Sequence, residues 1–196
     1  MKKLLFVAAM LTFSVAANAQ NEVGKFTFAP TVGLNLTNIT DAGDSKIKPG
    51  LVAGVNAEYG VIDKLGVTAG LMFSMQGAKY SSGGYTETMK LNYLNIPILA
   101  NYYVWKGLAV KAGIQLGFLL SAKETEKADG ESETFDFKKE CNTFDFAIPV
   151  GVSYEFSKFV VDARYNIHVS KIYKKEDGYQ PKSRNTVFQL MVGYKF

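Results

Sequence analysis

Residues 144–156 read Phe-Asp-Phe-Ala-Ile-Pro-Val-Gly-Val-Ser-Tyr-Glu-Phe, and this stretch decides the fold. Every second residue from Phe144 to Phe156 is apolar, and the residues between are small, polar or charged. A period of two places alternate side chains on opposite faces of a β-strand. The stretch is more than twice as long as the roughly 5–6 residues of an average strand. It is long enough for a tilted strand that crosses a bilayer, which takes roughly 9–11 residues.

Seven further segments show the same alternation. They are about Phe26–Leu36, Leu51–Tyr59, Leu65–Ala78, Leu91–Tyr103, Leu108–Leu120, Phe159–Val169 and Thr186–Phe196. An open sheet edge in lipid leaves backbone N–H and C=O groups without partners, so membrane-spanning strands close into a ring. We therefore predict an all-β fold, a closed eight-stranded antiparallel up-and-down transmembrane β-barrel.

The connections between these segments alternate in length. Residues 60–64, 104–107 and 157–158 make short links, whereas the links at 37–50, 81–90, 121–142 and 170–185 are longer and polar. Outer-membrane barrels have short periplasmic turns and longer external loops. The alternation therefore predicts that the short turns and both termini face the periplasm.

Aromatic residues gather near the two ends of the predicted strands. Amphipathic rings prefer the membrane interfaces, where outer-membrane barrels carry aromatic girdles. We expect one girdle at the short-turn end, comprising Tyr59, Tyr102, Trp105, Tyr154, Phe156, Tyr194 and Phe196. A second set lies toward the long-loop end: Tyr93, Phe118, Phe144, Tyr165 and Phe188.

Three prolines interrupt the strand pattern. Pro30, Pro97 and Pro149 each lie inside a predicted strand and each removes one ladder donor. A closed barrel has no edge strand on which to place them. We therefore expect β-bulges at these positions, with the side-chain alternation shifting by one residue beyond each.

The first residues have the pattern of a cleaved signal peptide. Lys2 and Lys3 precede an apolar run from Leu4 to Val15, and Ala17-Asn18-Ala19 forms a small-x-small cleavage site. We expect residues 1–19 to be the signal peptide and residues 20–196 to be one outer-membrane β-barrel domain that begins at Gln20.

Charge and cysteine content narrow the function classes. Without Lys2 and Lys3 the chain has 20 basic and 18 acidic side chains, so it lacks the concentrated basic character of nucleic-acid binding proteins. Cys141 has no second cysteine to pair with, and we interpret it as a tolerated free thiol. We expect no cofactor, no metal site and no nucleic-acid partner.

Several segments resemble a known family. They are Gly33-Leu34-Asn35-Leu36-Thr37-Asn38, Tyr93-Leu94-Asn95-Ile96-Pro97-Ile98-Leu99 and Gly151-Val152-Ser153-Tyr154-Glu155-Phe156. Together they are similar to the small "porin family" outer-membrane β-barrel domain. The resemblance implies a barrel integral to the cell outer membrane. The word porin is only a label of the family and is not evidence of a pore. The last strand, which ends at Phe196, looks like the C-terminal signal read by the barrel-assembly machinery.

Alternation also predicts what fills the barrel. Eight strands leave an interior just wide enough for side chains. The inward ionisable set is Glu58, Lys111, Asp145, Glu155, Asp162, Arg164, His168 and Lys195, with Asn56, Gln76, Asn95, Asn101, Gln115 and Gln189 as inward amides. Because unpaired charges in a dry interior are costly, we expect these groups to pair as a structural polar network.

Three functions are compatible with such a barrel. The first is a non-enzymatic protein with a filled lumen and a structural or surface-contact role. The second is a narrow diffusion pore for small solutes. The third rests on His168-Val169-Ser170, which resembles the His-x-Ser of outer-membrane lipid A deacylases, where the histidine activates the serine. Lys171 replaces the asparagine of that motif, and alternation points His168 inward, away from lipid.

Two of the predicted loops carry opposite charge. Residues 123–140 hold four lysines and seven acids, Glu124, Glu126, Asp129, Glu131, Glu133, Asp136 and Glu140. Residues 171–184 hold five basic residues, Lys171, Lys174, Lys175, Lys182 and Arg184. Three interpretations are open: the loops are solvated, they pair over the mouth, or they bind an extracellular ligand. Outer-membrane lipids and lipopolysaccharide are the expected surroundings, and the basic loop could hold lipopolysaccharide phosphates.

Overall fold

The computed structural model describes residues 22–41, 43, 45–82, 84–128, 131–176, 178 and 180–196. The predicted signal peptide at residues 1–19, the expected mature start at Gln20, and Asp129 of the acidic segment lie outside these residues.

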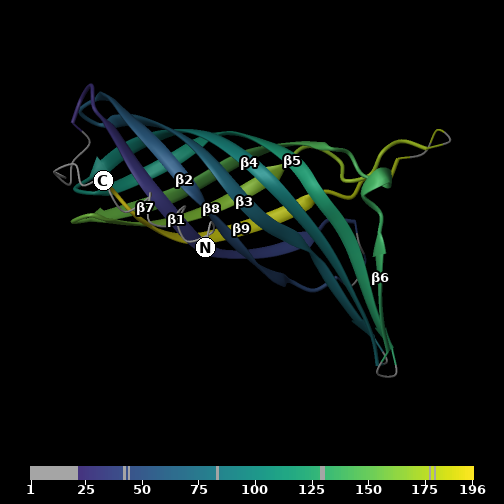
Figure 1. The fold of residues 1–196 in the computed structure, drawn as a ribbon. Coiled ribbons are helices and arrows are strands. Elements are labelled where there is room, and N and C mark those ends of the chain that lie inside the picture. Colours follow the sequence, from purple (N-terminus) through teal and green to yellow (C-terminus); the bar gives the residue numbers. More distant parts are fainter. Residues whose placement is uncertain are drawn as a thin grey trace, which may run out of the picture.

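Eight long antiparallel strands form a closed ring (Figure 1). The elements are β1 (Phe26–Ile39), β2 (Lys48–Ile62), β3 (Leu65–Ser82), β4 (Tyr85–Trp105), β5 (Leu108–Ala128), β6 (Glu131–Asp136), the 3-10 helix η1 (Lys138–Glu140), β7 (Phe144–Phe156), β8 (Phe159–His168) and β9 (Asn185–Tyr194). Consecutive strands pair, except that β7 pairs with β5 rather than with β6, and the β1–β9 pairing closes the ring. The predicted eight-stranded up-and-down barrel is therefore confirmed.

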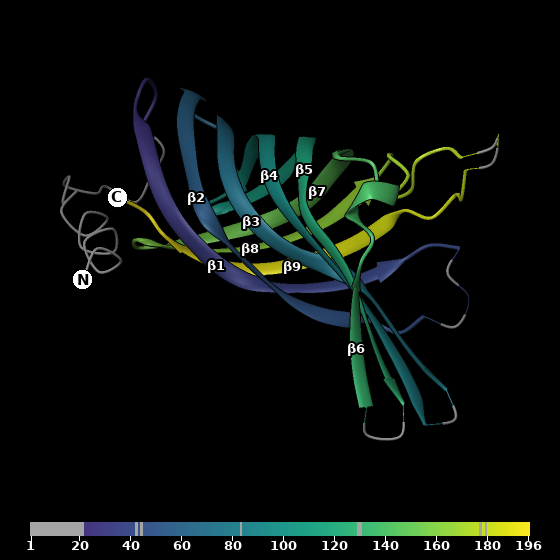
Figure 2. The same ribbon diagram turned by 45° about the vertical axis from the view of Figure 1, so that its right-hand side comes forward.

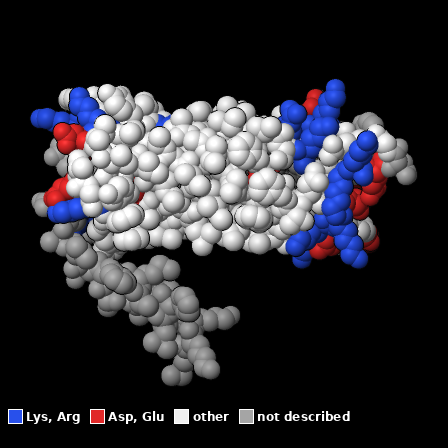
Figure 3. Space-filling view, turned by 90° about the horizontal axis from the view of Figure 1, so that it is seen from above, with Lys and Arg blue, Asp and Glu red and all other residues white. Residues whose placement is uncertain are grey.

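Side chains alternate between an apolar outer wall and a buried interior. On β7, Phe144, Ile148 and Phe156 are exposed, whereas Asp145 and Glu155 are buried. In the space-filling view, most charged groups lie at the two ends of the molecule and the wall between them is nearly uncharged (Figure 3). Such a band of outward apolar side chains is what a lipid-facing barrel requires.

The expected bulges at the three prolines are absent, and that prediction is wrong. Pro30 lies opposite Val55, Pro97 opposite Gln115 and Pro149 opposite Asn166, and the register does not shift at any of the three, although Pro97 is unpaired toward β3 and Pro149 toward β5. A proline forfeits only one N–H donor, and the paired residues on either side hold the register without it. Register shifts occur instead between Gly60 and Ile62, between Asn92 and Tyr93, and between Tyr103 and Trp105.

Several strands continue well past their predicted ends at the long-loop end. We expected strands over 65–78, 91–103 and 108–120, but β3 reaches Ser82, β4 starts at Tyr85 and β5 reaches Ala128. The predicted loop at 123–140 accordingly contains the end of β5, the extra strand β6 and η1. The expectation failed because backbone hydrogen bonds do not require apolar side chains, and alternating Thr with Lys or Glu also fits a solvated strand.

The extended parts of β3, β4 and β5 join β6 in a sheet that projects beyond the barrel (Figure 2). We call residues 77–82, 85–90, 123–128 and 131–136 the protruding sheet. Within the described ranges, no helix is both long and apolar enough to cross a membrane.

Candidate functional site

A buried ion triad lies in the half of the lumen nearer the short-turn end. Asp162 accepts hydrogen bonds from Lys111 Nζ at 2.7 Å and from Arg164 Nε at 2.6 Å and Nη2 at 3.0 Å. Each of the three side chains is at most 6% exposed. Alternation on β5 and β8 brings them together, because all three point inward from neighbouring parts of the ring.

A second network lies between the triad and the short-turn end, with Tyr103 at its centre. The Tyr103 hydroxyl lies 2.8 Å from Glu58 Oε1 and 2.7 Å from Glu155 Oε1, so it can donate to either carboxylate. Lys195 Nζ donates to Glu155 Oε1 at 2.7 Å and lies 3.5 Å from Glu58 Oε2. Alternation predicted the three charged residues of this network, whereas Tyr103 was not predicted, although its inward parity on β4 was the available signal.

The two networks enclose little free space. Their six charged side chains, three cationic and three anionic, line one interior cavity of about 30 Å³: Glu58, Lys111, Glu155, Asp162, Arg164 and Lys195. A water molecule needs roughly 10–15 Å³ on this scale, so the cavity holds about two waters. Around these six side chains the charges balance and little free volume is left.

His168 lies nearer the long-loop end of the lumen and pairs with Asp145. The side chain of His168 is fully buried, and its Nδ1 is 2.7 Å from Asp145 Oδ2. The nearby Ser170 Oγ instead accepts a hydrogen bond from the backbone N–H of Phe146 at 2.9 Å. No hydrogen bond joins His168 to Ser170 among the described atoms.

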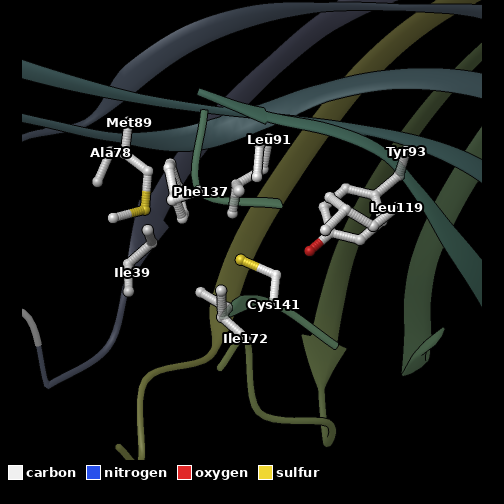
Figure 4. Close-up of a cluster of buried hydrophobic side chains, with 10 residues drawn as sticks. Ile39, Ala78, Met89, Leu91, Tyr93, Leu119, Phe137, Cys141 and Ile172 are labelled. Atoms are coloured by element: carbon white, nitrogen blue, oxygen red, sulfur yellow. The ribbon is translucent and has the colours of Figure 1, made fainter. Parts of the chain in front are cut away.

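A hydrophobic cluster, here called the plug, lies at the long-loop end of the lumen (Figure 4). It consists of buried side chains from four strands and two loops: Ile39, Ala78, Met89, Leu91, Tyr93, Leu119, Ala122, Phe137, Cys141 and Ile172. We expected Tyr93 in the aromatic set of the outer wall, but only 2% of it is exposed and its hydroxyl accepts a hydrogen bond from Asn185 inside the barrel. Tyr93 was misplaced because its position near the strand end was weighed above its inward parity.

Backbone contacts between the two loops hold the plug in place. Cys141 and Tyr173 form an isolated antiparallel bridge, and the Asn142 side chain donates to the carbonyls of Lys171 and Tyr173, both at 2.9 Å. Burial, followed by the nearby Glu140 carboxylate, raises the pKa of the Cys141 thiol to about 12. Cys141 therefore acts as a small apolar side chain of the plug.

The protruding sheet separates its charges by face. Residues directly opposite each other on antiparallel strands point to the same side. One row consists of Tyr80, Glu87, Glu126 and Glu133, and this inner face also carries Ala78 and Met89 of the plug. Burial, then the Glu87 and Glu126 carboxylates, raises the pKa of Glu124 on the same face.

The opposite face of the protruding sheet is basic and rich in hydroxyl groups. We call Lys79, Lys90, Lys123 and Lys127 the outward lysine face. Lys90 lies opposite Lys123, and a second row consists of Lys79, Thr88, Thr125 and Thr134. Counting charges along residues 123–140 hid this pattern, because lysines and glutamates alternate and so fall on different sides.

The basic loop at residues 171–184 does not pair with the acidic inner face in the described chain. Lys171 Nζ donates to Gln180 Oε1 at 3.2 Å, and Lys174 Nζ donates to the Lys139 carbonyl at 2.7 Å. The described side chains show no ion pair between this loop and the glutamates of the protruding sheet.

The residues expected in the short-turn girdle lie at that end of the wall. Tyr59, Tyr102, Trp105, Tyr154 and Phe156 are exposed, and Trp105 is the most exposed of them at 69%. Ring contacts run in sequence through Tyr154, Phe156, Phe159, Tyr194 and Phe196. In the described ranges, no group of three or more His, Cys, Asp or Glu side chains is placed to hold a metal ion.

Three solved structures illustrate what this chain is similar to. The Ail attachment invasion locus protein of Yersinia pestis is 18% identical, with 89% of this chain and 100% of that chain covered and a TM-score of 0.50. Ail in complex with the heparin analogue sucrose octasulfate is 17% identical, with 88% and 99% covered and a TM-score of 0.53. Neisserial surface protein A is 16% identical, with 87% and 97% covered and a TM-score of 0.50.

Sequence comparison assigns the family. No curated protein matches the chain significantly. The family model described as "Outer membrane protein beta-barrel domain" matches residues 18–174, which include every strand of the ring except β9. The exposed apolar wall, the ring of eight strands and this match agree on an outer-membrane location. The chain belongs to the outer membrane protein β-barrel domain family.

Proposed function

We propose that this protein is a non-enzymatic, non-conducting barrel that anchors the protruding sheet at the cell surface for contacts outside the cell. The plug is the observation that carries the proposal, because its buried side chains pack together at the end of the lumen from which the sheet projects, and we infer that they close it. The paired charges below the plug support the same conclusion, since they leave a cavity for only about two waters.

Single-channel recording tests the absence of conduction. We expect the mature chain, residues 20–196, refolded into a planar bilayer, to show no steady conductance while its heat-shifted gel mobility confirms folding. A narrow diffusion pore is the alternative function. Steady conductance that changes on Lys111→Gln or Arg164→Gln would establish the pore and contradict the proposal, because both side chains lie in the lumen.

Thiol labelling on intact cells tests which end faces outward. We expect the wild-type chain to resist a membrane-impermeant maleimide, because Cys141 is 1% exposed and burial, with the Glu140 carboxylate, raises its pKa to about 12. Ser82→Cys, at the exposed tip of the protruding sheet, should be labelled on intact cells. Lys106→Cys, in the turn after β4, should react only after the outer membrane is permeabilised. The reverse pattern would place the protruding sheet in the periplasm.

Two further features stay predictions. They are cleavage of the signal peptide at residues 1–19 and reading of the C-terminal strand by the barrel-assembly machinery. In support of the second, the backbone N–H of Phe196 donates to the Phe28 carbonyl at 2.9 Å, so the last residue lies on the seam that closes the ring.

A further inference from the structure

The outward lysine face has more positive charge than its surroundings neutralise. Asp136 is the acid that shares its rows, and Asp136 Oδ1 accepts a hydrogen bond from the backbone N–H of Lys138 at 3.0 Å. The described residues provide no ion pair for any of the four lysines. Lys90 and Lys123 are also direct cross-strand neighbours, a like-charge arrangement that destabilises a sheet. An anion bound between them would relieve this repulsion.

Hydroxyl groups and a groove accompany the lysines. Lys90 Nζ donates to Thr125 Oγ1 at 3.0 Å, and Thr125 Oγ1 lies 3.1 Å from Thr134 Oγ1. An open groove of about 750 Å³ is lined by Lys79 and Lys127 of this face, with Lys90 and Lys123 outside its lining. Its other lining residues are Lys48, Pro49, Gly84, Thr86, Thr88, Ala128, Glu131 and Ser132. Ammonium groups beside hydroxyl donors suit phosphate oxygens, which accept several charge-assisted hydrogen bonds.

The position of this face points to a membrane ligand. The outward side of β5 is apolar through Leu120, and Lys123 and Lys127 follow on the same side of the sheet. At about 3.4 Å per residue they lie about 10 Å and about 24 Å beyond Leu120 along the strand. The polar layer of a leaflet begins directly beyond the hydrocarbon and is about 5–8 Å thick, so Lys123 lies just outside it and Lys127 well outside it, within reach only of a lipid with an extended polar head. Because the lysine face continues the lipid-facing wall, a glycolipid packed against the barrel extends its polar head along it.

We infer that the outward lysine face binds the phosphate groups of the outer-leaflet glycolipid, lipopolysaccharide. The inference rests on the proposed function, because it gives one face of the protruding sheet its partner. It differs from the expectation that the basic loop 171–184 holds these phosphates. Lys171 and Lys174 of that loop donate to groups within the protein, whereas on the outward lysine face Lys90 alone does so among the described residues.

Titration of fluorescent lipopolysaccharide tests this inference. The mature chain is refolded in a zwitterionic detergent, and binding is followed by anisotropy at about 0.1 M salt. We expect the pair Lys90→Gln and Lys123→Gln to weaken binding about thirtyfold, as for two lysines near an anionic lipid surface. The matched pair Lys174→Gln and Lys175→Gln, in the loop, should change binding less than threefold. Heat-shifted gel mobility checks that each variant folds.

Three results would overturn the inference. They are unchanged binding by the Lys90 and Lys123 pair, equal weakening by the loop pair, and undiminished binding of lipopolysaccharide stripped of its phosphates. Heparin supplies a soluble polyanion for a fourth comparison. Heparin binding as tight as that of lipopolysaccharide would assign the face to a soluble sulfated saccharide instead. Because conduction is recorded separately on the same variants, loss of this inference would be distinguishable from loss of the proposed function.

Discussion

Asp162→Asn is expected to lower the free energy of unfolding by about 3–5 kcal/mol, the range for breaking a buried ion pair by removal of one partner. The change leaves Lys111 and Arg164 facing a neutral amide, although both cations stay at most 6% exposed. Urea titration of the refolded protein in detergent, followed by heat-shifted gel mobility, measures the effect.

Two companion variants separate the charge effect from a general loss of stability. Glu133→Gln removes an exposed carboxylate from β6 and should change the free energy of unfolding by less than about 0.5 kcal/mol. Combining Asp162→Leu with Lys111→Met and Arg164→Met removes the whole triad. It should recover most of the lost stability, because apolar groups can replace a complete buried ion network. If Asp162→Asn has the same free energy of unfolding as the wild type, the triad does not support the barrel.

Gly113→Val is expected to cost about 3 kcal/mol or more, or to prevent folding. Gly113 on β5 lies opposite the buried Leu99 of β4. A Cβ at Gly113 would meet the Ile98 carbonyl oxygen far inside van der Waals contact and lie 2.9 Å from Leu99 Cα. Both contacts are backbone atoms of the neighbouring strand, so only separation of β4 from β5 could relieve them.

The adjacent residue provides the matched control for this variant. Ala112 lies next to Gly113 on the same strand but points outward toward lipid. Ala112→Val therefore adds a β-branched side chain without a neighbour to displace, and should change stability by less than about 0.5 kcal/mol. The same urea titration compares the two. Equal stability of Gly113→Val and Ala112→Val would mean that β4 and β5 do not need the close approach at Gly113.

Period-two alternation allowed the ring and its inward residues to be predicted from sequence. Burial on one side of the wall fixes the register of a strand, so Asp162 and Arg164 could be placed inside from parity alone. Their partners could not be derived, because pairing across the lumen depends on which strands face each other and at what height. Tyr103 shows this, since it joins Glu58 and Glu155 from two other strands.

The long-loop end was predicted least well, for a physical reason. Hydrophobic periodicity stops where lipid stops, yet the backbone ladder of β4 and β5 continues into the polar region. Isolated apolar residues in charged segments, such as Phe137 and Ile172, were the available signal for the plug, because an apolar side chain amid charges is usually buried. The alternation of lysines and glutamates was also present in the sequence. It separates the two charges by face only if residues 123–128 form a strand, which the sequence did not predict.

The division between plug and protruding sheet also determines where this protein can vary over time. Every residue of β6 is exposed, whereas the plug consists of buried residues such as Phe137, Cys141 and Ile172. An antibody or phage that reaches the cell surface therefore contacts positions that can be substituted without disturbing the packing of the plug. Populations under such attack should accumulate substitutions along residues 131–136 and leave the side chains that close the mouth unchanged.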